Sequence, residues 1–118
     1  MDDKDIEKIE DIIKERQYAH NFFLKNSMVY RSFVELEQKT FSDRELRKKY
    51  KELIALGISI IINCESCIEW HINEALKSGA TFEEIIETIE VGIEMGGGPA
   101  TVTSRFALKV LEFYKNKK

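Results

Sequence analysis

Two cysteines and a histidine lie close together in one segment of the chain, residues 63–71, NCESCIEWH. Cys64 and Cys67 are the only cysteines, and their Cys-x-x-Cys spacing allows a small disulfide ring. His71 follows Cys67 by four residues, and an imidazole titrates near neutral pH. A dithiol beside a proton carrier suits thiol redox chemistry, in which the thiolate is the nucleophile. The same three side chains could instead bind a metal ion.

Ligand number weighs against a metal site. Zinc prefers four ligands in proteins, and Cys64, Cys67 and His71 supply three, so Glu52 or a water molecule would have to be the fourth. A second Cys-x-x-Cys or Cys/His pair is missing from the sequence. We therefore favour the redox interpretation and expect neither a metal nor a cofactor.

The position of the cysteines in a helix gives them a reason to be reactive. Asn63 is a plausible N-cap, which would place both cysteines in the first turn of the helix that follows. There the free N–H groups and the positive end of the helix dipole favour a thiolate over a thiol. Since His71 lies four residues after Cys67 and seven after Cys64, all three side chains share one helix face.

Glu52 is a fourth candidate. If the helix before Asn63 and the helix after it form an antiparallel pair, Glu52 and His71 lie at similar heights. The glutamate could then orient His71 or accept protons from the thiols. A glutamate chosen without other information more often faces solvent, so that alternative stays open.

These residues must be positioned by helices, and the sequence predicts an all-α fold. An apolar stripe indicates a first helix, a second covers about residues 27–39, and the capping box Ser42–Glu45 would begin a long helix towards Ile62. The cysteine helix would end at Gly79. A second capping box, Thr81–Glu84, opens a helix that Gly96–Gly98 ends, and Pro99 begins the last helix, to about Tyr114. The apolar residues expected to face inward are Ile6, Ile9, Ile13 and Tyr18 in the first helix and Ile85, Ile86, Ile89 and Ile93 in the fifth.

One segment, residues 57–62, is rich in β-prone residues, but the preceding capping box and the lack of hairpin turn residues favour a helix there. We therefore predict a compact domain of about five to six helices spanning residues 1–118.

Composition excludes several classes of function. A net charge of -3 and the absence of a basic stripe before the Lys115–Lys118 tail argue against nucleic-acid binding. The longest apolar run, Leu53–Ile62, is too short to span a membrane. The acidic start does not resemble a signal peptide, so we expect a cytoplasmic protein, in which a Cys-x-x-Cys pair is catalytic or metal-binding rather than a structural staple.

The spaced set of Glu52, Cys64, Cys67 and His71 resembles the active-site signature of the alkylhydroperoxidase D-like branch of the carboxymuconolactone decarboxylase family. The flanking segments are similar too: KELIAL at 51–56, GAT at 79–81 with Glu84-Ile85, and GGGPA at 96–100. The resemblance covers about residues 30–113.

The resemblance implies an all-helical domain that forms homo-oligomers, commonly trimers or hexamers. It also implies a peroxidase in which Cys67 attacks a hydroperoxide, Cys64 resolves the sulfenic acid as a disulfide, and Glu52 with His71 relays protons. A dithiol or protein reductant would restore the thiols. The chain departs from the family at Ser66, where peroxidase members often carry a histidine; a hydroxyl there could pass a proton but not hold one.

Two further functions fit parts of the pattern. The family name points to a decarboxylase of a lactone carboxylic acid, a lyase chemistry that needs an acid/base pair but no dithiol. A redox-sensing module without turnover would use the same disulfide as a switch.

Overall fold

The structure is a computed structural model that describes residues 1–117, and within that range it contains six helices and no strand. The predicted all-α class is confirmed, and residues 57–61 are helical as expected. The helices are α1 (Asp3–Asn26), α2 (Met28–Thr40), α3 (Lys48–Ile61), α4 (Glu65–Lys77), α5 (Phe82–Gly96) and α6 (Gly98–Asn116).

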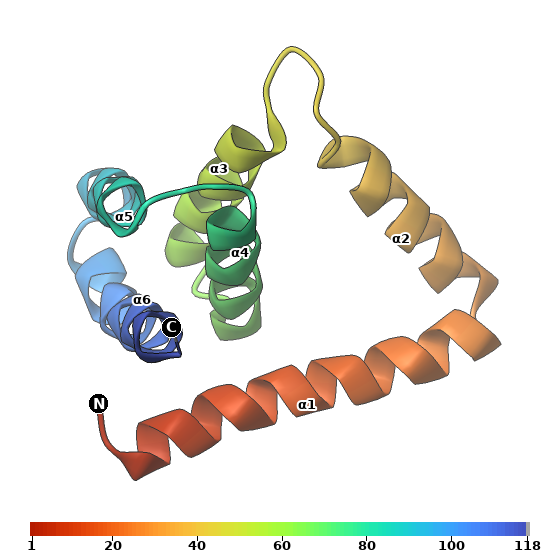
Figure 1. Ribbon diagram of the computed structural model, residues 1–118, viewed down its shortest axis with the longest axis horizontal. Coiled ribbons are helices and arrows are strands. Elements are labelled where there is room, and N and C mark those ends of the chain that lie inside the picture. Colours follow the sequence, from red (N-terminus) through yellow and green to blue (C-terminus); the bar gives the residue numbers. More distant parts are fainter. Residues whose placement is uncertain (118) are drawn as a thin grey trace.

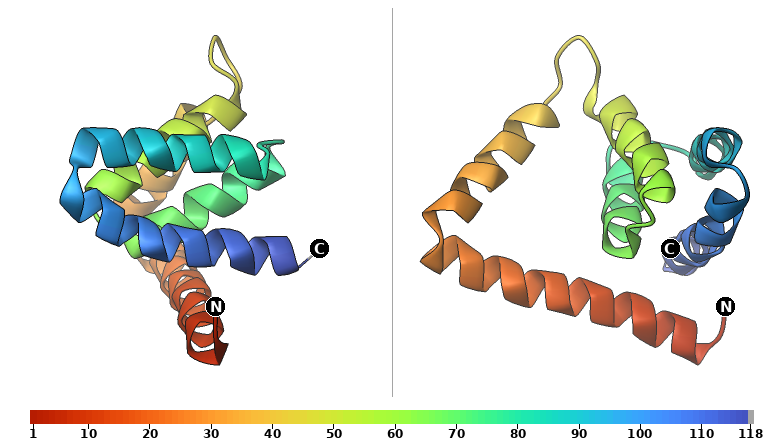
Figure 2. Two further views of the ribbon diagram at one scale, coloured as in Figure 1. Left: turned by 90° about the vertical axis from the view of Figure 1, so that its left-hand side faces the viewer. Right: turned by 180° about the vertical axis from the view of Figure 1, so that it is seen from behind.

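The hydrophobic core lies among α3, α4, α5 and α6 (Figure 1). α3 and α4 run antiparallel and pack side by side (Figure 2). α5 packs mainly on α3, and α6 contacts α5, α4 and α3. Full burial of each large aliphatic side chain stabilises the fold by about 1.5–3 kcal/mol relative to exposure. The fully or almost fully buried aliphatic residues of these helices are Leu56, Ile60, Ile68, Ile72, Ile85 and Val110.

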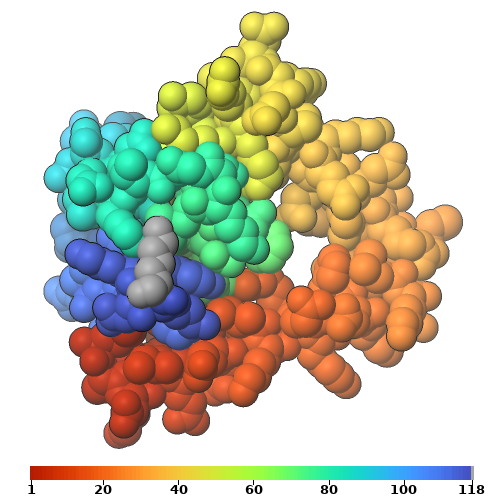
Figure 3. Space-filling model, in the orientation of Figure 1, coloured from red at the N-terminus to blue at the C-terminus, as the bar shows by residue number. Residues whose placement is uncertain are grey.

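α1 and α2, residues 3–40, form an arm that is attached to this core at one end. The first half of α1 packs on the core through Ile9, which is fully buried. The second half projects past α4, and α2 turns back from its tip (Figure 1). α2 contains no buried residue and packs against α1 but against no other helix of the described chain. Figure 3 shows a hollow between the side chains of α2 and those of the core.

The predicted start of α3 is wrong. The helix begins at Lys48, after a loop, and not at the Ser42–Glu45 capping box. The Ser42 hydroxyl donates to the carbonyl of Lys39, at the end of α2, and is therefore not a cap for the next helix. Asp43 caps the helix instead, although it lies five residues before Lys48 in the sequence. Its carboxylate accepts a hydrogen bond of 2.6 Å from the backbone N–H of Lys48.

The prediction of inward-facing apolar residues is wrong at one position in α1 and at one position in α5. Tyr18 is 78% exposed because it lies on the face of α1 opposite the buried Ile9, and Ile86 is 46% exposed on the outer face of α5. The second capping box is confirmed, with reciprocal bonds between Thr81 and Glu84 at the start of α5. Pro99 lies in the first turn of α6, as predicted.

Candidate active site

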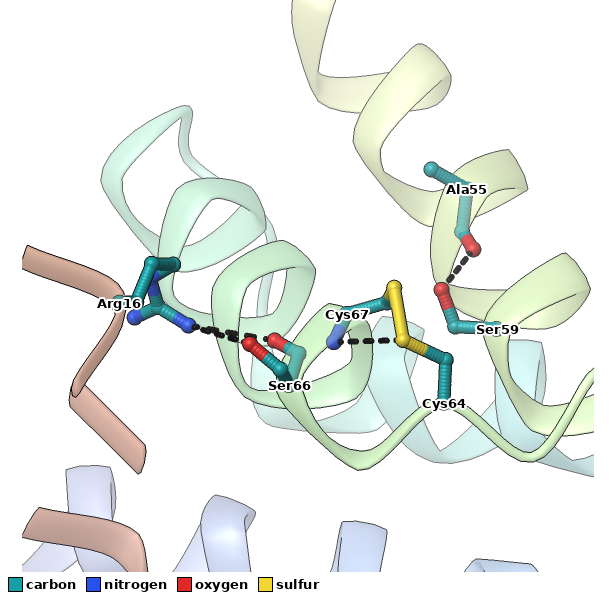
Figure 4. Close-up of a disulfide and its surroundings, with 6 residues drawn as sticks. All are labelled: Arg16, Ala55, Ser59, Cys64, Ser66 and Cys67. Carbon is teal, nitrogen blue, oxygen red and sulfur yellow. Dashed lines mark hydrogen bonds between the residues drawn. A yellow bond between two sulfur atoms is a disulfide. The ribbon is translucent and has the colours of Figure 1, made fainter. Parts of the chain in front are cut away.

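Cys64 and Cys67 are joined by a disulfide at the start of α4 (Figure 4). The predicted N-cap is displaced by one residue: Cys64 is the N-cap, and its sulfur accepts a hydrogen bond of 3.2 Å from the backbone N–H of Cys67. Asn63 adopts a left-handed conformation with a φ of 55°, which turns the chain from α3 into α4. Both cysteines therefore lie at the positive end of the helix, as the sequence predicted.

Glu52 and His71 are in contact across the α3–α4 pair. The Glu52 carboxylate lies 2.7 Å from Nδ1 of His71, and Glu52 is 2% exposed. The antiparallel geometry expected from the sequence is thus confirmed, and the solvent-facing alternative for Glu52 is wrong. A buried carboxylate on one ring nitrogen orients the imidazole and favours a proton on that nitrogen, so the other nitrogen is free to exchange protons.

The second carboxylate oxygen of Glu52 is also engaged. Lys48, one turn earlier on α3, places its amine 3.1 Å from Glu52 Oε2 and 2.9 Å from Glu74 Oε1. Burial disfavours the charged amine, but the hydrogen bonds to Glu74 and Glu52 outweigh it and raise the pKa of Lys48 above its usual value. Burial acts against the Glu74 carboxylate as well, yet Lys48 lowers its pKa below the usual value.

Ser66 lies between the cysteines, and its side chain is directed towards α1. Arg16 donates to both the carbonyl and the hydroxyl of Ser66, each at 3.2 Å (Figure 4). The hydroxyl is therefore hydrogen-bonded to a guanidinium, and its part in a proton relay stays a prediction.

A cavity of about 630 Å³ opens beside the disulfide, between the arm and α4. This volume falls in the range of small-molecule sites. Cys67, Trp70 and His71 line it on the side of α4, and Phe41 stacks near His71 with ring centres 5.4 Å apart. The arm supplies the opposite wall, in which four aromatic or apolar residues and four polar ones take part: His20, Tyr30, Phe33 and Leu36, with Arg16, Gln17, Glu37 and Thr40.

Glu69 is a buried residue of this region that the sequence analysis missed. It is fully buried on α4 and pairs with Arg16 from α1, while the Tyr114 hydroxyl of α6 donates to its other oxygen. Burial and this hydrogen bond raise the pKa of Tyr114. Arg16 also stacks over Trp70, 5.0 Å from the ring centre. The available signal was the position of Glu69 on the apolar face of α4, beside Ile72.

His20 of α1 is part of the cavity wall. Its Nδ1 lies 2.7 Å from the Tyr30 hydroxyl, and the residue is half-buried in the cavity wall.

Residues 1–117 hold no group of three or more His, Cys, Asp or Glu side chains arranged to bind a metal ion. Within the same residues, no helix is both long and apolar enough to span a membrane.

The sequence itself is similar to known proteins. The profile of the carboxymuconolactone decarboxylase family matches residues 28–110. Uncharacterized protein 4 in the cox locus of Paracoccus denitrificans is 40% identical over 81 residues, which are 69% of this chain and 73% of that protein. An uncharacterized protein of Cupriavidus necator is 36% identical over 72 residues, 61% of each chain.

Solved structures share the fold. A carboxymuconolactone decarboxylase family protein from Legionella pneumophila superposes with a TM-score of 0.81 at 33% identity, covering 92% of this chain and 96% of its own. A family member from Thermotoga maritima gives a TM-score of 0.82 at 24% identity, covering 90% of this chain and 91% of its own. By the extent of the profile match and the identity to its relatives, the chain belongs to the carboxymuconolactone decarboxylase family.

Proposed function

We propose that the protein is a thiol-dependent peroxidase of the alkylhydroperoxidase D-like type, a disulfide oxidoreductase that reduces hydroperoxides. The observation that carries the proposal is a dithiol pair at a helix N-terminus, one turn from a histidine that is held by a buried glutamate. For the Thermotoga maritima relative, involvement in an antioxidative response has been suggested. We further propose that the protein works in the cytoplasm, where a reduced thiol pool keeps the pair active.

The surroundings of the two cysteines support the roles that we propose for them. Cys67, and not Cys64, is among the residues that line the cavity, so a substrate in the cavity meets Cys67. The Cys67 thiolate attacks the terminal peroxide oxygen and the O–O bond breaks, which gives a sulfenic acid and releases an alcohol after proton transfer from His71. The sulfur of Cys64 then attacks the sulfenic sulfur of Cys67 and forms the disulfide. The hydroxide that is displaced takes up the thiol proton and leaves as water. A dithiol or protein reductant then reduces the disulfide and regenerates both thiols.

Substitution of each cysteine tests this order. Peroxide consumption in the presence of a dithiol reductant should fall to background in Cys67→Ser. In Cys64→Ser, Cys67 should still react with one equivalent of peroxide to give the sulfenic acid, and a second equivalent should oxidise it to the sulfinic acid, visible by mass spectrometry. Serine is a good N-cap, so the second variant keeps the start of α4. Full peroxidase activity in Cys67→Ser would refute the proposal, and lactone decarboxylation by that variant would favour the lyase.

We also propose that the protein is a homo-oligomer, a trimer or hexamer. α3 carries an exposed apolar stripe at helical spacing, formed by Tyr50, Ile54, Ile58 and Ile61, each about half exposed. Contiguous apolar patches on a protein surface mark interaction sites. Light scattering should give a multiple of the chain mass, and Ile58→Lys should lower that mass. A wild-type monomer at micromolar concentration would refute this part of the proposal.

A further inference from the structure

Lys48 occupies a position that helix stability does not explain. It is the first residue of α3, where the positive end of the helix dipole disfavours a cation, and the first turn of α3 contains no acidic residue. Its i,i+4 pair with Glu52 has the lysine before the glutamate, the less favourable order. A lysine here therefore costs helix stability, and its placement calls for another reason.

The contacts of Lys48 supply that reason. Its amine bridges Glu52 of α3 and Glu74 of α4, at 3.1 and 2.9 Å, and the other oxygen of Glu52 is bound to His71. The buried carboxylate is thus held between an imidazole and an ammonium group. Without Lys48, Glu52 could rotate away from His71, and the Glu52–His71 pair would lose a neighbouring positive charge.

We propose that Lys48 is a positioning residue of the site, which fixes Glu52 against His71 and keeps the Glu52–His71 pair ready to accept a proton from Cys67. This deepens the proposed function and rests on it for the role of the pair in turnover. Glu74 has the opposite effect, because its carboxylate neutralises part of the charge of Lys48. Loss of Lys48 should therefore make the pair retain its proton at higher pH, and loss of the Glu74 charge should make it release the proton at lower pH.

Other charged side chains of the neighbouring helices pair elsewhere or line the cavity. Lys77 of α4 lies 3.4 Å from Glu74 on the exposed side, and Lys49 of α3 pairs with Glu84 of α5 at 3.0 Å. On the cavity side, Arg16 of α1 and Glu37 of α2 line the same cavity as His71. Lys49 follows Lys48 directly and makes an ion pair elsewhere, so it offers a matched control.

The test measures the rate of iodoacetamide alkylation of reduced Cys67 against pH, in a Cys64→Ser background. In Lys48→Met the midpoint of the rate profile should move to higher pH by about half a unit, because one positive charge beside the Glu52–His71 pair is lost. At any pH below the midpoint, the alkylation rate should then fall about threefold. In Glu74→Gln the midpoint should move down. Lys48→Arg should restore the wild-type profile, and Lys49→Met should leave it in place.

Opposite shifts in Lys48→Met and Glu74→Gln support the proposal, because a merely structural role would not give shifts of opposite sign. Shifts in the same direction, or an unchanged profile in Lys48→Met, would overturn it. Melting temperatures confirm that each variant is folded, and Glu74→Gln provides an independent arm if Lys48→Met is not. Alkylation needs no peroxide turnover, so a wild-type protein without peroxidase activity refutes the proposed function and still allows Lys48 to be tested.

Discussion

The core and the arm are both built from amphipathic helices, yet they bury very different amounts of apolar surface. α3–α6 bury a continuous set of aliphatic side chains, whereas α2 buries none. The arm is attached at one end, where Ile9 of α1 and its neighbouring isoleucines pack on the core. Charged contacts of α1 add to this attachment, above all Arg16 with Glu69.

The two regions also divide the candidate site between them. The two cysteines lie at the start of α4, and the Glu52–His71 pair joins α3 to α4, where packing fixes the geometry. The arm contributes the outer wall of the cavity. This division predicts that a change in the core affects the stability of the whole fold, while a change in the arm affects mainly what the cavity accepts.

The largest expected effect comes from a cavity in the core. Leu56 is fully buried on α3, and Leu56→Ala should lower the free energy of unfolding by about 4 kcal/mol. Phe33 of the arm is 59% exposed, so Phe33→Ala should change it by less than about 0.5 kcal/mol. Urea unfolding followed by circular dichroism measures both. Similar losses in the two variants would mean that α2 is packed as firmly as α3.

A smaller loss is expected when the arm is released from the core. Arg16→Met leaves the fully buried Glu69 without its cationic partner, which should cost about 3 kcal/mol. The control is Lys8→Met, since Lys8 and Glu65 are both largely exposed and their pair is worth less than about 1 kcal/mol. Urea unfolding of both variants tests the difference. An Arg16→Met protein as stable as Lys8→Met would show that Glu69 does not depend on Arg16.

The smallest expected effect concerns Asp5, at the start of α1, and appears at acidic pH. The hydrogen bonds to Lys109 and to the backbone of Asp2 lower the pKa of Asp5 from 3.8 to about 2. Because the folded state lowers this pKa, the contribution of Asp5 to stability is present above pH 3.8 and is lost as the pH falls towards 2. Melting temperatures from pH 5 to pH 2 should therefore fall more steeply in wild type than in Asp5→Asn. Added salt should narrow that gap, since the pair is near the surface; equal slopes would contradict the assignment.

Most of the candidate site was predictable from the sequence, because its geometry depends on residue spacing within one helix and on a short turn between two helices. The spacing of Cys64, Cys67 and His71 fixes their shared helix face, and the short turn between two helices brings Glu52 beside His71. The start of α3 was not predictable, because the Ser42 hydroxyl bonds back to α2 and the capping pattern alone does not show this competition.

The remaining contacts depend on how distant segments dock. Arg16 and Glu69 are separated by 53 residues, and nothing in the local pattern of either indicates the other. The bond between Lys48 and Glu74 likewise needs the register between α3 and α4 to be known. Long-range pairs of charges are a matter of tertiary packing, which periodicity in one sequence does not specify.

The hydrogen bond from the Cys67 amide to the Cys64 sulfur has a consequence for observing the protein at work. One sulfur atom caps the start of α4 and, in the proposed reaction, changes its bonding in each catalytic cycle. A thiolate, a thiol and a disulfide sulfur differ in charge and in strength as acceptors, so the Cys67 amide senses which of them is present. The resonance of this amide in 15N-labelled protein should therefore report the redox state by NMR, with no probe attached to the protein.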